Sequence, residues 1–368
     1  MTILDKKREA ILPESGLINK ETSTVKCAIL GCRGRARAHA NAYQDIERGH
    51  LAAICDMNVE RLNEFGQMFD IDQRYTDIHQ MLEKEKPDLL HIVTAPVLRG
   101  TNELIRYPLL KIAADHQVPG VIIEKPIAVM GEDYRQIQDL AEQVQTKVAV
   151  NTQLHFHPKN LELKQDVAAG KIGDIKLIDA SCRNPPVDQA PHTLQLVSSY
   201  IDNSPPLRVM GQIAGNQHLN SDQPSPDNAT ARIEYANGIQ ASIVFGSELG
   251  TQVLPDTSNN RHKRVCVFGT QGFVHWRFES WEKFTPATGY QGGDLSYSAQ
   301  NSMAQINLTE AMFDWLEDDQ KVHPTNLHQS LAEFNLLLGI YQSGMTNQPI
   351  ELPFDPPDNL IQKMKKQL

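Results

Sequence analysis

The chain has 368 residues, of which 40% are hydrophobic and 22% charged, and 35 Lys and Arg against 45 Asp and Glu give it a formal net charge of −10. This composition predicts a globular protein of about two domains, and the negative charge excludes a protein that binds nucleic acid or anionic membranes through general electrostatics. No stretch approaches the ~20 apolar residues of a membrane-spanning helix, and the N-terminus lacks the apolar core of a signal peptide.

The five cysteines are widely spaced and form no CxxC pair or cluster with histidine. This pattern argues against a disulfide scaffold and against a structural metal site. We therefore predict small buried thiols in a reducing compartment, and a cytoplasmic protein that holds no metal.

In the first part of the chain, short apolar runs alternate with amphipathic segments. Residues 1–23 are polar and aperiodic, and we interpret them as an N-terminal arm. The predicted strands are Val25–Leu30, Leu51–Asp56, Asp88–Ala95, Val118–Pro126 and Lys147–Asn151, and the predicted helices are Ala36–Glu47, Val59–Phe69, Asp77–Glu85, Ile105–Asp115 and Gly131–Gln145. Five such alternations predict an α/β fold, with a doubly wound parallel sheet of the Rossmann type over residues 24–151.

After residue 151 the pattern changes to longer strands with two-residue alternation. Predicted strands lie in Asp174–Arg183, on both sides of a hairpin turn at Asn237-Gly238, and on both sides of Gly269–Gly272, with helices at Leu161–Ala169 and His328–Ser343. Asn-Gly between alternating runs is a strong hairpin signal. We predict a second α/β domain over 152–368 with a large open, mostly antiparallel sheet. The polar segment Asn203–Asp227 is predicted to be a surface loop.

A glycine turn follows the first predicted strand and leads into the first predicted helix. Its sequence is GCRGRARAH, Gly31–His39. In a dinucleotide-binding turn the first glycine makes the bend, the second lets the backbone approach the pyrophosphate, and the third position permits close packing. Gly31, Arg33 and Ala36 take these positions, so Arg33 departs from the pattern, although Gly34 follows it. The alternative is a packing turn that binds no ligand.

An acid, Asp56, ends the second predicted strand 25 residues after Gly31. A carboxylate at this place binds the 2′-hydroxyl of the adenosine ribose, and its charge disfavours a 2′-phosphate. The sequence therefore predicts NAD as the cofactor and makes NADP less favourable, although Arg33 or Arg35 could weaken that preference by reaching a phosphate. The predicted cofactor-binding residues of this region are Gly31, Arg33, Gly34, Arg35, Ala36 and Asp56.

Lys125 lies at the end of the fourth predicted strand, between Glu124 and Pro126. The carboxyl ends of the strands in an open α/β sheet face the ligand crevice. Lys125 is therefore predicted to point into the site, the alternative being an ordinary surface lysine.

Asp188 and His192 are four residues apart, and Pro191 suits the first position of a helix. We expect His192 in the first turn of that helix and Asp188 just before it. A helix N-terminus disfavours imidazolium, so His192 could accept a proton while Asp188 stabilises the resulting cation. The alternative is a capping Asp beside an unrelated His. The competing histidines are His155 and His157.

In order and spacing these features resemble the Gfo/Idh/MocA family, the glucose-fructose oxidoreductase and inositol dehydrogenase family. The resemblance covers about residues 24–355 and rests on the turn Gly31–His39, Asp56, EKPIA at Glu124–Ala128, Asn151, GKIGDI at Gly170–Ile175, the pair Asp188 and His192, FGTQG at Phe268–Gly272 and Leu352-Pro353. It implies a Rossmann domain and a second α/β domain for substrate binding, whose open sheet often forms an oligomer interface.

The resemblance also implies NAD(P)-dependent oxidation of sugars, polyols or their derivatives. Lys125 would hydrogen-bond the reacting hydroxyl, His192 would be the general base in oxidation, and Asp188 would orient His192. Further cofactor contacts are implied for Thr94, Ala95, Glu124 and Lys125, and substrate contacts for Lys125, Asn151, Gln153, His155, Arg183, Asp188 and His192. Three departures bear on the substrate: Gln153 and Gln195 replace an Arg and an Asp that are common in the family, and the loop Val93–Gly100 lacks its usual Asn or His.

We therefore predict an NAD-dependent sugar, cyclitol or sugar-derivative dehydrogenase that acts on a small-molecule substrate and forms a homo-oligomer through its second sheet. Two alternatives stay open: a dinucleotide-binding sensor without turnover, and a redox-neutral enzyme that uses NAD to cleave a glycoside. Retention of Lys125, Asp188 and His192 favours an enzyme over a sensor.

Overall fold

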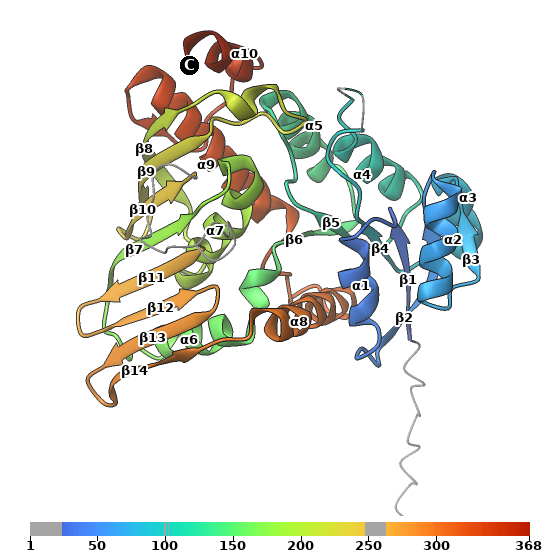
Figure 1. The fold of residues 1–368 in the computed structure, drawn as a ribbon, viewed down its shortest axis with the longest axis horizontal. Coiled ribbons are helices and arrows are strands. Elements are labelled where there is room, and N and C mark those ends of the chain that lie inside the picture. Colours follow the sequence, from blue (N-terminus) through green and yellow to red (C-terminus); the bar gives the residue numbers. More distant parts are fainter. Residues whose placement is uncertain (1–23, 99–100, 102, 247–262) are drawn as a thin grey trace, which may run out of the picture.

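The computed structural model describes residues 24–98, 101, 103–246 and 263–368, which form two sheets with helices between and around them (Figure 1). The predicted arm at residues 1–23 lies outside the described residues. All five cysteines are buried, as predicted. In the part of the chain that the structure describes, no helix is long and apolar enough to span a membrane.

The first sheet is parallel and six-stranded. In spatial order its strands are β3 (Gln73–Tyr75), β2 (Gly49–Cys55), β1 (Val25–Leu30), β4 (Leu89–Ile92), β5 (Gly120–Glu124) and β6 (Lys147–Asn151). The helices that connect them are α1 (Ala36–Ala42), α2 (Val59–Met68), α3 (Ile78–Glu85), α4 (Arg106–Asp115) and α5 (Gly131–Ala141). This strand order confirms the predicted Rossmann sheet. Sheets of this kind bind ligands at the switch point, which here lies between β1 and β4.

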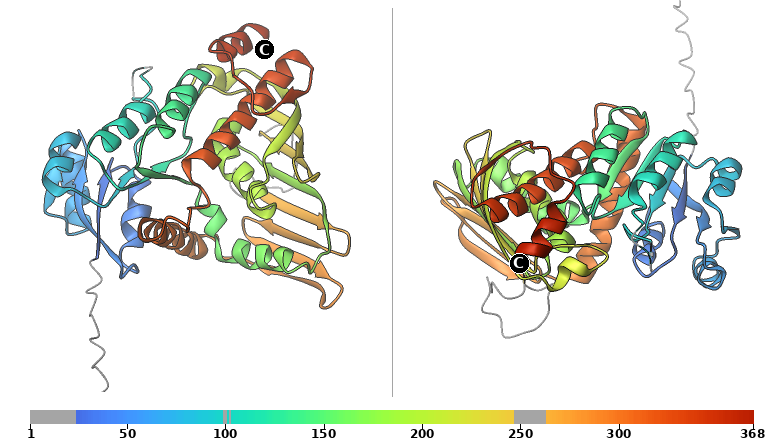
Figure 2. Two further views of the ribbon diagram at one scale, coloured as in Figure 1. Left: turned by 180° about the vertical axis from the view of Figure 1, so that it is seen from behind. Right: turned by 90° about the horizontal axis from the view of Figure 1, so that it is seen from above.

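Helices cover both faces of this sheet, because successive side chains of each strand point to opposite sides. On β1, Cys27 and Ile29 pack with α1, α2 and the later helix α8 (Tyr297–Glu317), while Ala28 and Leu30 pack with α3, α4 and α5. Helix α8 therefore belongs by sequence to the second half of the chain but packs on the Rossmann sheet, as the views in Figure 2 show.

The second sheet has nine strands. In spatial order they are β14 (Gly289–Asp294), β13 (Ser280–Thr285), β12 (Phe273–Arg277), β11 (Arg264–Gly269), β7 (Ile175–Cys182), β10 (Gln240–Phe245), β9 (Asn228–Tyr235), β8 (Pro206–Ala214) and β15 (Ile350–Glu351). Only β7 and β10 pair in parallel, so the prediction of a mostly antiparallel sheet is confirmed. The predicted hairpin is also confirmed, with Gly238 at φ 80° between β9 and β10.

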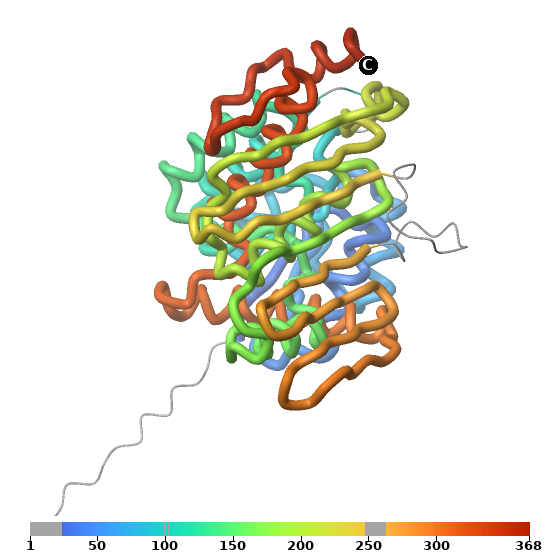
Figure 3. Tube along the Cα trace, turned by 90° about the vertical axis from the view of Figure 1, so that its left-hand side faces the viewer, coloured from blue at the N-terminus to red at the C-terminus, as the bar shows by residue number. Residues whose placement is uncertain are grey.

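One face of the nine-stranded sheet packs against helices. These are α6 (Pro158–Ala168), α7 (Pro186–Tyr200) and α9 (Leu327–Thr346), with α10 (Leu360–Gln367) following at the end of the chain. Figure 3 looks onto the opposite face, which no described helix covers. A one-sided sheet of this kind fits the alternation of buried and exposed residues from which it was predicted.

The prediction of a surface loop over Asn203–Asp227 is wrong. The segment contains β8, which pairs with β9, and a short 3-10 helix at Gln217–Asn220. The strand was hidden because it lies near the edge of the sheet and exposes polar residues such as Arg208 and Gln212.

Glu333 on α9 is a buried carboxyl among apolar neighbours, including Leu194, Phe334 and Leu337. Burial raises the pKa of Glu333 from 4.5 to about 8, although a hydrogen bond from Gln329 (2.9 Å) opposes the shift. The folded chain therefore holds a proton that the unfolded chain has lost between about pH 4.5 and pH 8. Stability falls as the pH rises through that window.

We expect Glu333→Gln to remove this pH dependence, because the amide is neutral and can still accept the hydrogen bond from Gln329. The gain over the wild type should be small at pH 5 and on the order of a few kcal/mol at pH 9. Thermal unfolding at both pH values measures it, with the exposed Glu142→Gln as the control. A difference that does not grow between the two pH values would show that Glu333 is already ionised at pH 5.

Candidate active site

A cavity of about 370 Å³ opens where β1, β2 and β4 end. Its lining includes Gly31, Asp56, Thr94 and Ala95, four of the residues predicted to contact a cofactor. Gly31 has φ 93°, and a Cβ atom there would lie 2.9 Å from the carbonyl oxygen of Val93. The turn therefore needs glycine at this position. Because glycine has no side chain, the backbone of Gly31 itself lines the cavity.

Asp56 at the end of β2 is held by four hydrogen bonds. Its Oδ1 accepts from the Asn58 amide (2.9 Å) and from Arg61 Nη2 (2.5 Å), and its Oδ2 accepts from the Cys32 amide (2.8 Å) and from Arg61 Nε (2.8 Å). Burial opposes ionisation, but Arg61 and the two amides outweigh it and lower the pKa of Asp56. The glycine turn, β2 and α2 are thereby tied together at this carboxylate.

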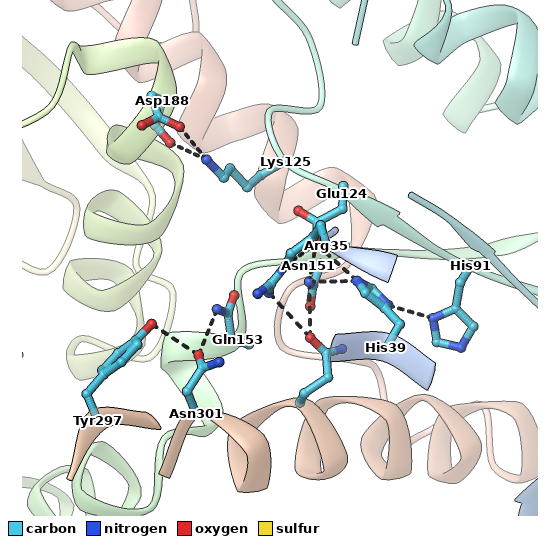
Figure 4. Close-up of polar contacts among 11 residues, drawn as sticks. Arg35, His39, His91, Glu124, Lys125, Asn151, Gln153, Asp188, Tyr297 and Asn301 are labelled. Carbon is cyan, nitrogen blue, oxygen red and sulfur yellow. Dashed lines mark hydrogen bonds and ion pairs between the residues drawn. The ribbon is translucent and has the colours of Figure 1, made fainter. Parts of the chain in front are cut away.

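Glu124 at the end of β5 is the centre of a buried polar network, shown in Figure 4. Its Oε1 accepts hydrogen bonds from Arg35 Nε (2.7 Å) and Asn151 Nδ2 (2.6 Å) and lies 3.0 Å from His39 Nε2. Burial opposes the charge, but Arg35 and His39 hold the pKa of Glu124 well below its usual value. The network extends from His39 to His91 (2.9 Å).

Three residues that were predicted to contact ligands belong to this network. Arg35, expected at a cofactor phosphate, directs its guanidinium to Glu124. Glu124 and Asn151, expected at the cofactor and the substrate, bond to the same group of side chains. Their position at the carboxyl ends of β5 and β6 is the predicted one, and their contacts with ligands stay predictions.

The structure brings Lys125 and Asp188 together. Lys125 follows β5, and its Nζ lies 2.6 Å from Oδ1 and 2.7 Å from the carbonyl oxygen of Asp188 on α7 (Figure 4). Asn184 and Gln189 hydrogen-bond Oδ2 of the same carboxylate at 2.7 and 3.0 Å. Burial opposes ionisation, but Lys125 and these amides hold the pKa of Asp188 well below its usual value.

The predicted start of the helix that carries His192 is wrong. Helix α7 begins at Pro186 and contains Pro191 in its interior, so Asp188 lies in the first turn and His192 in the second. Pro186 has the fixed φ and lacks the amide donor that suit a first helical position. The sequence holds prolines at 185, 186 and 191, and the later one was taken as the start.

His192 is buried, and its Nδ1 has no hydrogen-bond partner among the described residues. Burial, together with the positive charges of Lys263, Lys125 and Arg35, holds the pKa of His192 well below 6.5. The imidazole is therefore neutral at pH 7. No hydrogen bond joins Asp188 to His192 in the described part of the chain, so an orienting role for Asp188 stays a prediction.

The remaining predicted residues lie on several different elements. Gln153 donates to Asn301 on α8 (3.0 Å), which also accepts from Tyr297 (3.1 Å), as Figure 4 shows. His155 Nδ1 lies 2.9 Å from Gln195 Nε2. Arg33 and Gly34 are exposed, Ala36 is buried, and Arg183 is half-buried just after β7.

Lys263 was not predicted. It lies directly before β11 and is 4% exposed, and burial lowers its pKa to about 8. Its charge acts on Lys125, Asp188 and His192, so it belongs to the same centre. In the sequence it is one basic residue of the run Arg261–Arg264, and nothing in that run distinguishes it. His39, which contacts Glu124, was not predicted either. It is the last residue of the motif Gly31–His39, and that position was the available signal.

Comparison with known proteins agrees with this geometry. Residues 25–152 match the Gfo/Idh/MocA oxidoreductase family, described by its NAD-binding Rossmann fold. Over these residues the chain has the Rossmann domain of the Gfo/Idh/MocA family. D-apiose dehydrogenase of Rhizobium rhizogenes is 23% identical over 79% of this chain and 81% of its own length. D-apiose dehydrogenase of Paraburkholderia graminis is 31% identical over 43% of this chain and 40% of its own length.

The fold of the chain is shared by solved structures. An oxidoreductase from Agrobacterium radiobacter, solved with NAD⁺, L-tartaric acid and magnesium, superposes with a TM-score of 0.73 at 21% identity, over 89% of this chain and 98% of that one. At this identity the likeness establishes the fold alone. The glycine turn at Gly31 and the cavity beside it fit the NAD that the family's Rossmann domain binds.

Proposed function

We propose that this protein is an NAD-dependent dehydrogenase that oxidises a secondary alcohol of a sugar, cyclitol or sugar derivative. The observation that carries the proposal is the pairing of Lys125 with Asp188 beside the buried, neutral His192. Lys125 directly follows the carboxyl end of β5, an edge of the Rossmann sheet at which this fold binds dinucleotides. The similar D-apiose dehydrogenases support a sugar as the substrate class.

In this proposal His192 accepts the hydroxyl proton, for which its lowered pKa keeps it unprotonated at pH 7. Lys125, already held in place by Asp188, donates a hydrogen bond to the same oxygen and stabilises its developing negative charge. The bound nicotinamide supplies the acceptor for the hydride that leaves the carbon. In the reverse direction His192 returns the proton.

The predicted cofactor contacts divide between two places. Gly31, Asp56, Thr94 and Ala95 line the cavity in which the adenosine half would lie. Glu124 and Lys125 end β5, toward the substrate. Asn151, Gln153, His155 and Arg183 are proposed to contact the substrate from β6, the turn after it, and β7.

Turnover of a substrate panel tests the proposal. Purified protein is mixed with NAD⁺ and a range of pentoses, hexoses, cyclitols and aldonates, and NADH is followed by its absorbance. Oxidation of at least one compound, with the reacting carbon located in the product, supports a dehydrogenase. NAD binding without oxidation of any compound would favour the sensor, and cleavage of a glycoside without accumulation of NADH would favour the redox-neutral enzyme.

We also propose the boundary near residue 151 and a homo-oligomer that covers the open face of the second sheet. That face exposes large side chains, among them Met210, Phe268, Phe284 and Tyr290. A charged substitution such as Phe268→Glu should lower the mass measured by light scattering if copies of the chain pair there.

A further inference from the structure

The adenosine end of the dinucleotide site contains an acid that is already neutralised. A carboxylate offers about four acceptor positions, and in Asp56 two are taken by the backbone amides of Cys32 and Asn58 and two by Arg61. A ribose hydroxyl would therefore find no vacant acceptor on Asp56 while Arg61 stays in place. Such a carboxylate also loses most of its repulsion for an anion.

Arg61 lies between two neighbouring cavities. It lines both the cavity of about 370 Å³ and a neighbouring one of about 290 Å³ on the outer side of the glycine turn. Arg33, the residue that replaces the middle glycine, lines both as well. Arg37 lines the outer one, where the only acid in the lining is Glu64.

In the part of the chain that the structure describes, two of these three arginines have no carboxylate partner, and the third keeps a free donor. Among the described residues, Arg33 and Arg37 form no ion pair, and Arg61 uses Nε and Nη2 on Asp56 while its Nη1 makes no hydrogen bond. Arg33 is exposed, and the side chain of Arg61 is 30% exposed. Arg61 and Asp56 compensate each other, so Arg33 and Arg37 stand against the single carboxylate of Glu64 and leave an excess of positive charge around the pair. In a protein of net charge −10 this makes a local site for an anion.

A Rossmann domain reads the 2′ position of the adenosine ribose at this place, with an acid for the hydroxyl of NAD or an arginine for the phosphate of NADP. In this protein the acid, Asp56, and the arginine, Arg61, are both present, and Arg61 donates two hydrogen bonds to Asp56. Resting on the proposed dinucleotide site, we propose that Arg61 determines cofactor specificity, and that with Arg33 it lets the protein bind the 2′-phosphate of NADP as well as NAD. Asp56 then serves to position Arg61, and the preference for NAD that Asp56 alone would impose is largely removed.

The expected result is that the wild-type protein binds NADP⁺ within about tenfold of NAD⁺, since one charge-assisted contact is worth about this much. Arg61→Ala should weaken NADP⁺ binding by about 10- to 100-fold and leave NAD⁺ binding unchanged or tighter, because Asp56 is released to accept the ribose hydroxyls. Asp56→Ala should change NAD⁺ binding little, because Asp56 offers the ribose no vacant acceptor in the wild type. Lys111→Ala, an exposed lysine on α4 of the same domain, is the control for a simple loss of charge.

Calorimetry with NAD⁺, NADP⁺, 5′-AMP and 2′,5′-ADP measures these affinities without turnover. A preference for 2′,5′-ADP over 5′-AMP that is lost in Arg61→Ala supports the inference. More than 100-fold preference for NAD⁺ in the wild type, or an unchanged preference in Arg61→Ala, overturns it. Binding of both dinucleotides without turnover of any substrate would contradict the dehydrogenase and leave this inference standing, whereas binding of neither would overturn both.

Discussion

Lys125→Ala is expected to lower kcat by about 10²- to 10⁴-fold while NAD binding is largely kept. Lys125 reaches Asp188 through its Nζ, and neither residue lines the cavity that contains Gly31 and Asp56. Removing the ammonium therefore removes the hydrogen bond to the reacting oxygen and leaves the adenosine site intact. Steady-state kinetics with the best compound of the panel, together with calorimetry for NAD⁺, measures the two effects separately.

The loss of Lys125 should not unfold the protein. Asp188 keeps its hydrogen bonds from Asn184 and Gln189. Lys125→Arg keeps the charge but replaces a compact ammonium by a planar guanidinium, so it should recover little activity. Lys111→Ala is again the matched control. Near wild-type turnover in Lys125→Ala would remove Lys125 from the mechanism.

The parts of the fold that could be predicted are those whose local pattern decides their environment. The strands β1 and β6 were predicted with the bounds that the structure shows, because an apolar run between turn residues is typical of a strand buried on both faces. The hairpin at Asn237-Gly238 followed from the left-handed backbone that such a turn requires.

The elements that were missed owe their structure to distant contacts. Helix α8 buries Gln305 and Thr309 as well as Met312 and Phe313, so its sequence shows no clean apolar stripe. It is stabilised by the Rossmann sheet, where Met312 contacts the backbone region of Gly120. No local pattern in residues 297–317 could have shown that this segment forms a helix that packs on the Rossmann sheet.

The same division holds for the candidate site. Strand ends can be located from sequence, and this brought Asp56, Glu124 and Lys125 to the correct edge of the sheet. The hydrogen-bond partners of side chains cannot be predicted in this way, because they depend on how distant elements pack together. Asp56 was expected to face a ribose and is bonded to Arg61, and Arg35 was expected at a phosphate and is bonded to Glu124.

His192→Ala is the second variant for which we expect a fall in kcat of about 10²- to 10⁴-fold with NAD binding largely kept. In the proposed mechanism the imidazole of His192 is the proton acceptor beside Lys125, and alanine leaves the hydroxyl proton without that acceptor. His275→Ala is the matched control, since His275 on β12 is also buried and is bonded to Glu282 (2.8 Å), away from the site.

The pH profile distinguishes a base from a residue that only fills space. Oxidation requires the unprotonated form of His192, which exists above its pKa, and burial with the charges of Lys263 and Lys125 places that pKa well below 6.5. Activity should therefore fall only as the pH drops below 6.5 and into the range of the lowered pKa. Lys263→Met removes the charge with the largest effect on the pKa of His192, so it should move the acidic limb of kcat/KM to higher pH. If that limb is centred at or above pH 6.5 in the wild type, or if Lys263→Met leaves it in place, the group that titrates is not a buried His192 and the proton acceptor is a different residue.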